Sequence, residues 1–217
     1  MSGRFLSLVL FVGLAGAVAA LVPQIGALRL PANQQSYEPV QPIKYSHRLH
    51  AGELGIPCLY CHSAAETSRH AGIPSASVCM NCHQFVTAPL GAIRAEDVLA
   101  EKEKRRPRRI VSPELQKLYD ALALGANLQR DPNREPRPIV WTKVHNLPDY
   151  VYFDHRAHVN AGVACQQCHG PVETMERVRQ ASDLSMGWCV DCHRTTTAAR
   201  GMGRKANPLT DCATCHY

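Results

Sequence analysis

The chain has 217 residues, which is room for one or two compact domains. It has only 4 Phe, 2 Trp and 7 Tyr against 15 Pro, so large side chains supply little bulk for a conventional core and a bound group is expected to help fill it. The formal net charge of +6 favours nucleic acid or an anionic lipid surface only if no bound anion offsets it.

Residues 5–22 form an uncharged, largely apolar stretch between Arg4 and Pro23. Eighteen residues in a helix span about 27 Å, which is just enough for the hydrocarbon core of a bilayer. The Ala-Val-Ala run at 17–19 resembles a signal-peptide cleavage site, which is the competing interpretation. We expect a retained anchor over residues 1–30 with a single membrane-spanning helix.

The ten cysteines form five pairs, each with two residues between the partners and a histidine directly after the second cysteine. The five motifs are Cys58–Cys61–His62, Cys79–Cys82–His83, Cys165–Cys168–His169, Cys189–Cys192–His193 and Cys212–Cys215–His216. C-x-x-C-H is the attachment signal for c-type haem: the thiols bind the porphyrin covalently and the histidine is the proximal ligand of the iron. Zinc sites and disulfides do not require a histidine after every pair. We therefore predict five haem c groups.

Covalent haem is attached on the far side of the membrane from the cytoplasm. The motifs therefore put the chain after the anchor on the extracytoplasmic, periplasmic side, and Arg4 before the apolar stretch agrees weakly. Five haems also carry about ten propionates, so the basic excess is explained as charge compensation. Nothing in the sequence requires nucleic acid.

A repeated pattern divides the chain after the anchor into two haem-binding modules. In each copy an aromatic residue precedes His-Arg-x-His, an Ala-Gly step follows, and a haem motif comes next; the copies begin at Tyr45 and Phe153. The first module, residues 31–84, contains two motifs, and the second, residues 145–217, contains three. We expect a mainly α fold with short helices, much irregular structure and no strands.

The segment between the modules, residues 85–144, is interpreted as a linker or insert with one helix. Its basic run, residues 102–109, is most simply a solvated face. The helix is indicated by Ser112 as N-cap, Pro113 at the first position and Gly125 past the end. Between them, Leu115, Leu118 and Leu122 form a stripe at helical spacing.

Eleven histidines occur, and five belong to the motifs. The other six, each a candidate distal ligand, are His47, His50, His70, His145, His155 and His158. A porphyrin and a motif histidine leave one position on the iron, so His47 and His50 cannot bind the same haem. Residues three apart lie about 5–6 Å apart in a helix, so two haems must meet at that turn if both are ligands. The same holds for His155 and His158.

The order of an aromatic residue, x-His-x-x-His and then C-x-x-C-H resembles the class III cytochromes c, which are small multihaem electron carriers. In that family the first histidine ligates the haem attached next and the second ligates the haem after it. The resemblance implies that His47 serves the haem on Cys58 and Cys61, and that His50 serves the haem on Cys79 and Cys82. In the same order, His155 and His158 serve the haems on the third and fourth motifs.

The distal ligand of the fifth haem, on Cys212 and Cys215, is left open. By the family's arrangement it comes from shortly before the fourth motif, where Met186 stands in place of a histidine. A thioether ligand raises the reduction potential relative to imidazole. The alternatives are His70 or His145 reaching the iron from elsewhere, with Met186 merely packing on a haem.

A narrower resemblance covers nearly the whole chain from Pro42 onward, except the basic run. It is carried by His50-Ala51-Gly52-Glu53-Leu54-Gly55-Ile56, Ala71-Gly72-Ile73-Pro74-Ser75, Val144-His145-Asn146-Leu147-Pro148-Asp149 and Met186-Gly187-Trp188-Cys189. With five motifs and one amino-terminal helix, these segments resemble the pentahaem cytochrome c subunit of bacterial alternative complex III. The resemblance implies a quinol-oxidising membrane complex, typically using menaquinol. The implied partners are integral membrane quinol-binding subunits, an iron–sulfur subunit, a monohaem cytochrome c subunit, and a soluble electron acceptor or terminal oxidase.

Two other functions are considered. A free-standing, membrane-anchored multihaem quinol dehydrogenase that feeds periplasmic reductases would have the same amino-terminal helix. A catalytic multihaem reductase would need an iron with an open position. Five proximal histidines and at least five candidate distal ligands leave no iron obviously open, and no motif replaces its histidine with lysine. We predict an electron carrier with no catalytic residue of its own.

Overall fold

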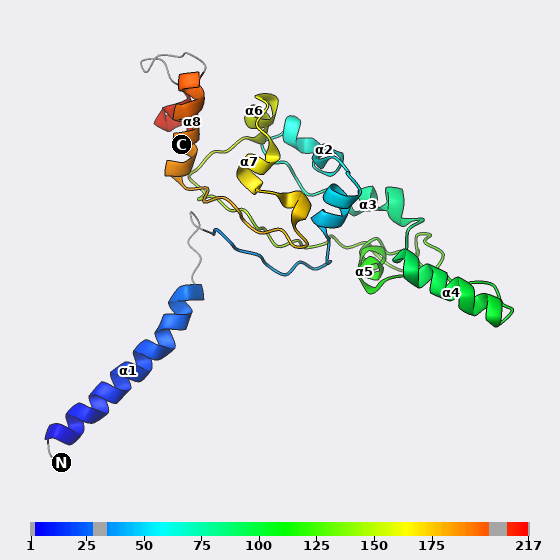
Figure 1. Cartoon of the computed structure of the whole chain (residues 1–217), viewed down its shortest axis with the longest axis horizontal. Helices are drawn as coiled ribbons and strands as arrows, with labels where there is room; N and C mark the ends of the chain where they lie inside the picture. Colours follow the sequence, from blue (N-terminus) through cyan, green and yellow to red (C-terminus); the bar gives the residue numbers. More distant parts are fainter. Residues whose placement is uncertain (1–2, 28–33, 200–207, 217) are drawn as a thin grey trace.

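The computed structural model describes residues 3–27, 34–199 and 208–216. Its α-helices are α1 (Gly3–Ala27), α2 (Cys58–Cys61), α3 (Ala76–His83), α4 (Leu90–Lys102), α5 (Pro113–Ala121), α6 (His155–Asn160), α7 (Cys165–His169), α8 (Met186–Ala199) and α9 (Cys212–Cys215). A π-helical turn, η1 (Arg48–Glu53), and three 3₁₀ turns, η2 (Ser63–Glu66), η3 (Val172–Thr174) and η5 (Pro208–Thr210), complete the elements described. The described residues contain no sheet, only two isolated bridges, so the predicted mainly α, irregular fold is confirmed (Figure 1).

Helix α1 stands apart from the remainder of the chain in Figure 1. Its large apolar side chains are exposed, with Phe11 at 71% and Leu14 at 66%. A helix was predicted here, and one is present. Among the residues that the structure describes, however, no helix is both long and apolar enough to cross a membrane. The predicted membrane crossing is therefore not found in the described residues; the side chains at 23–27, at the carboxyl end of α1, lie outside them.

Helix α5 forms where the sequence predicts it. The Ser112 hydroxyl accepts a hydrogen bond from the backbone N–H of Leu115 at 3.3 Å, and Pro113 occupies the first position. The helix ends at Ala121 rather than next to Gly125, because Ala123 turns the chain into the left-handed region with φ of 54°. Leu118 of the predicted stripe is buried.

The insert has two helices where the sequence analysis expected one. The additional helix is α4, whose buried side chains are Glu96 and Ala100 rather than large apolar residues, so it lacks the leucine stripe that reveals α5. The Glu96 carboxylate accepts hydrogen bonds from the Arg105 guanidinium and from the backbone N–H of Arg108. These bonds lower the pKa of Glu96 to about 2. The basic run therefore folds back onto α4 in part, instead of forming only a solvated face.

The two haem-binding modules interlock. The N–H of Arg48 in η1 donates to the carbonyl of Met175 at 2.9 Å, just after η3. A Cβ on Gly52 would collide with the carbonyl of Glu173, so this crossing of η1 and η3 requires glycine. On the other side, the Asn160 side chain of α6 donates to the Glu66 carbonyl of η2. Residues of the first module thus contact the second through both η1 and η2.

Candidate haem-binding site

The five cysteine pairs lie on short helical segments. The pairs of the first, third and fifth motifs begin α2, α7 and α9, and the second and fourth lie within α3 and α8. Residues i and i+3 of a helix share a face, so the two sulfurs of each pair point to the same side, as the two thioether bonds to one porphyrin require. All ten cysteines are free of disulfides. No group of three or more His, Cys, Asp or Glu that could hold a metal ion occurs among the described residues.

The protein interior contains few large apolar side chains, which leaves space for bound porphyrins. The buried apolar residues among those described are mostly small; they are Ala65, Ala88, Ala100, Leu118, Tyr119, Ala123 and Met175. Large apolar side chains in or beside the motifs are exposed in the protein chain alone: Tyr60 is 49% exposed, Phe85 75% and Met186 71%. A chain of this length ordinarily buries most of its apolar side chains. The residues present therefore fit haem groups that supply the missing apolar volume.

Three pairs of imidazoles face each other at one spacing. The ring centres are 6.1 Å apart for His50 and His83, 6.4 Å for His155 and His169, and 6.0 Å for His158 and His193. An imidazole nitrogen lies about 2 Å from a bound metal and about 1 Å from its own ring centre, so two imidazoles on opposite sides of one metal have centres about 6 Å apart. In each pair the structure brings together the motif histidine and the distal histidine that the class III resemblance pairs with it.

Hydrogen bonds hold most of these rings by the same atom. Nδ1 lies 2.7–2.8 Å from a backbone carbonyl oxygen in six of the histidines, namely His50, His62, His83, His155, His158 and His193. A ring that donates its Nδ1–H in this way keeps Nε2 deprotonated and available to a metal. These carbonyls come from Ser46, Gly72, Val86, Arg69, Asp154 and Leu209. Residue identity carries no signal for a backbone acceptor, so sequence reasoning missed them.

The repeated aromatic residue supports both histidines of its module in the same way. Tyr45 meets His47 edge-on at 4.8 Å and stacks on His50 at 4.4 Å. Phe153 meets His155 edge-on at 4.9 Å and stacks on His158 at 4.6 Å. The aromatic residue is therefore part of the ligand-holding geometry. The four contacts match closely enough to show that the two modules repeat in structure as well as in sequence.

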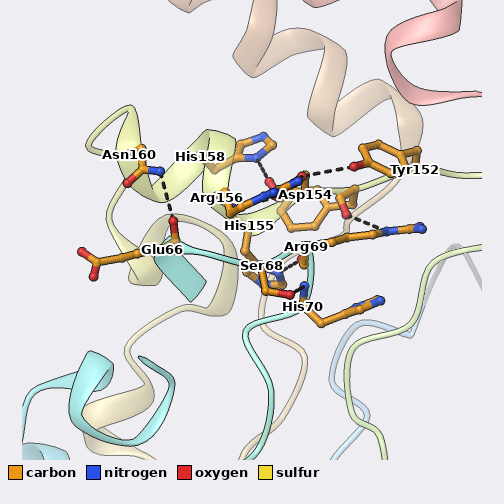
Figure 2. A network of polar contacts seen from close by, with 11 residues as sticks. Glu66, Ser68, Arg69, His70, Tyr152, Asp154, His155, Arg156, His158 and Asn160 are labelled. Carbon is orange, nitrogen blue, oxygen red and sulfur yellow. Dashed lines mark hydrogen bonds and ion pairs between the residues drawn. The ribbon is translucent and has the colours of Figure 1, made fainter. Parts of the chain in front are cut away.

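Arg69 ties the second module to the first (Figure 2). Its carbonyl accepts from His155 Nδ1 at 2.8 Å, and its guanidinium donates to the carbonyl of Phe153 and lies 4.4 Å from the centre of the Tyr152 ring. The first module thus orients a histidine of the second. In Figure 2 the neighbouring His70 ring points away from His155 and His158, and His70 is exposed.

His47 and His145 are both partly buried, and each differs from the six histidines above. Burial and the nearby His62 lower the pKa of His47 to about 4, and its Nδ1 has no hydrogen-bond partner. Burial and then His155 lower the pKa of His145 to about 4. Both are therefore neutral at pH 7, which is the form that binds a metal. His145 lies against His169 instead of facing a motif histidine at the 6 Å spacing.

The cysteines show which motifs are neighbours in space. Burial is the main cause that raises the pKa of five thiols, and a thiol of another motif raises each of them further. The pKa of a thiol is raised by a thiol of another motif in five cases: Cys61 by Cys82, Cys79 by Cys61, Cys165 by Cys58, Cys168 by Cys189, and Cys189 by Cys215. The motifs therefore adjoin in the order second, first, third, fourth, fifth. The contact between the first and third lies where the modules interlock.

The last motif adjoins the start of the second module. The N–H of Tyr152 donates to the carbonyl of Cys215 at 2.7 Å, and Val151 pairs with His216 in an isolated bridge. The His216 ring stacks on Tyr150 at 5.9 Å. No contact between His216 and any of His70, His145 and Met186 is found in the described part of the chain, so the fifth distal ligand stays a prediction.

Two similarities to known proteins agree with this site. Residues 151–217 match the family described as cytochrome c7 and related cytochrome c. The chain is also 30% identical over 129 residues to the multihaem cytochrome c subunit of menaquinone reductase from Nitratidesulfovibrio vulgaris (strain Hildenborough). That match covers 59% of this chain and 45% of the relative, so this chain spans less than half of the relative's length.

Replacing His50 tests the facing-imidazole geometry. His50→Ala should convert one haem from low-spin to high-spin without releasing any haem, because covalent attachment depends on the cysteines. The electron paramagnetic resonance spectrum of the oxidised protein measures the change. His50→Met is the matched control: it retains a sixth ligand and should stay low-spin at a raised potential. An entirely low-spin His50→Ala protein would contradict the pairing of His50 with His83.

Proposed function

We propose that this multihaem cytochrome c, related to cytochrome c7 over residues 151–217, carries five haems and relays electrons as a subunit of a membrane quinone oxidoreductase. The observation that carries the proposal is the set of three facing imidazole pairs at 6.0–6.4 Å. Haem held between two imidazoles supplies one-electron redox chemistry without an open position for substrate. Such a site transfers electrons and does not turn over a substrate.

The adjoining order of the motifs supports a continuous relay. The haem on Cys79 and Cys82 would lie at one end, the haem on Cys212 and Cys215 at the other, and the first and third haems at the junction of the modules. The junction is held by a backbone hydrogen bond between η1 and the residue after η3, and by a hydrogen bond from the Asn160 side chain of α6 to the Glu66 carbonyl of η2. Electrons would enter and leave at the two ends.

The partners follow from similarity. The relative from Nitratidesulfovibrio vulgaris is a subunit of a menaquinone reductase, and the sequence resembles the pentahaem subunit of alternative complex III, which oxidises quinol. Both belong to quinone-active complexes, but a menaquinone reductase delivers electrons to the quinone, whereas alternative complex III takes them from quinol. Because the alternative complex III resemblance covers more of this chain, we assign the electron donor to quinol at membrane subunits, with an iron–sulfur partner between. The acceptor would be a monohaem cytochrome c or another periplasmic carrier. A free-standing quinol dehydrogenase is the second candidate, because the chain has an apolar α1 of its own.

The haem-bearing part would lie on the extracytoplasmic side of the cell membrane, because c-type haem is attached there. The exposed apolar side chains of α1 support attachment at the membrane, since 52–71% of Val9, Phe11 and Leu14 is left uncovered by the chain itself. Lipid or an apolar subunit would cover them.

Purification of the full-length protein from membranes tests this function. The cytochrome should stay with washed membranes, require detergent for release, and co-purify with integral membrane and iron–sulfur subunits. In that preparation a menaquinol analogue should reduce the haems, and the isolated subunit should accept no electrons from it. Isolation as a homo-oligomer that a quinol reduces directly would contradict the relay role and favour the free-standing dehydrogenase.

We also propose Met186 as the distal ligand of the haem on Cys212 and Cys215. Met186 is 71% exposed in the protein chain, and it begins α8 three residues before Cys189, whose thiol neighbours Cys215. His145 is engaged by His169, and the His70 ring points away from the adjacent haem ligands. Of the three candidates, Met186 is therefore the one that we assign to the fifth haem.

Met186→His should lower the potential of one haem, because imidazole stabilises ferric iron more than a thioether does. A redox titration followed by optical absorbance measures the shift. Val98→His puts an imidazole on the exposed surface of α4, outside the haem motifs, and should leave all potentials unchanged. If the Met186→His titration matches that of the native protein, Met186 only packs against the haem.

A further inference from the structure

The third motif histidine differs from the others in what it bonds. Nδ1 of His62, His83 and His193 lies 2.7–2.8 Å from a backbone carbonyl, and Nδ1 of His216 lies 3.4 Å from another. Nδ1 of His169 instead lies 3.2 Å from Nε2 of His145. The Nδ1 atom of one proximal histidine therefore lies next to a side-chain imidazole, whereas the Nδ1 atoms of the other four lie next to backbone carbonyls.

The geometry separates His145 from the axial ligands. Its ring centre is 4.4 Å from that of His169 and the two planes are perpendicular at 89°. Two ligands on opposite sides of one iron need about 6 Å between ring centres. The partner of His169 at that spacing is His155, at 6.4 Å with the planes 3° apart. His145 therefore touches the back of His169, away from the iron.

His169 would bind the haem iron through Nε2, because Nδ1 is the atom that faces His145. Its Nδ1 then carries the hydrogen, and His145 Nε2 accepts it. A partner on this hydrogen fixes the orientation of the ring and makes the ligand more basic. A more basic ligand stabilises ferric over ferrous iron and so lowers the reduction potential. At the other motifs a backbone carbonyl lies at Nδ1 of the proximal histidine. A backbone carbonyl cannot be removed by substitution, but the His145 side chain can.

We propose that His145 is a positioning residue that, through His169, sets the reduction potential of the haem on Cys165 and Cys168. This haem adjoins both the first and the fourth motif in the relay, so its potential controls passage between the modules. The proposal rests on the assignment of haem to the third motif, but it does not depend on the identity of the quinone or of the partner subunits.

The test compares His145→Leu with His145→Gln in the full-length, haem-loaded protein. His145→Leu removes the acceptor and should raise the midpoint potential of one haem while every haem stays attached and low-spin. His145→Gln keeps an acceptor oxygen and should restore part of the shift. Asn146→Leu changes the adjacent residue to the same side chain and should shift nothing. Redox titration and electron paramagnetic resonance give the two readings.

Two results would overturn the proposal. A high-spin signal in His145→Leu would make His145 an axial ligand, and potentials equal to those of the native protein would reduce its role to packing. Failure of the cytochrome to co-purify with membrane subunits would overturn the proposed function alone, because neither measurement on the isolated protein depends on those subunits.

Discussion

The requirement that two imidazoles face each other across about 6 Å organises this protein. Nδ1 bonds to backbone carbonyls aim the rings. Some of these carbonyls lie within four residues of the ring, as for His50, His83 and His158, whereas Arg69 is 86 residues from His155. The irregular course of the chain leaves such carbonyls free to accept. A strand or a long helix would present its carbonyls to its own hydrogen-bond ladder, whereas loops leave them available to ligand rings.

The same constraint explains why few large side chains are buried and why backbone contacts connect the two modules. Few large side chains are buried, because the apolar volume is left to the porphyrins. A chain that wraps bound groups has few side-chain contacts of its own to hold its parts together, so close backbone contacts have that role. The crossing of Gly52 with Glu173 and the bond from His155 to Arg69 bring the first and third motifs next to each other. Without that junction, the chain would hold two separate haem clusters and no relay.

Much of this arrangement was accessible from the sequence, because covalent attachment requires a local motif and ligand pairs require a fixed spacing. The class III resemblance paired His50, His155 and His158 with the motif histidines that they now face. Helix α5 was found from its cap and leucine stripe, whereas α4 was missed because it buries Glu96 and Ala100. The Arg69 acceptor of His155 and the position of His145 behind His169 could not be predicted, since they depend on how distant segments pack.

Binding of carbon monoxide to the reduced native protein tests the central claim most directly. If two protein ligands hold every iron, carbon monoxide finds no open position, and the absorbance spectrum of the reduced protein should not change when the gas is added. A shift of the main absorbance band by even one haem equivalent would reveal an iron open to small molecules. That result would contradict an electron relay with closed irons and favour a catalytic haem.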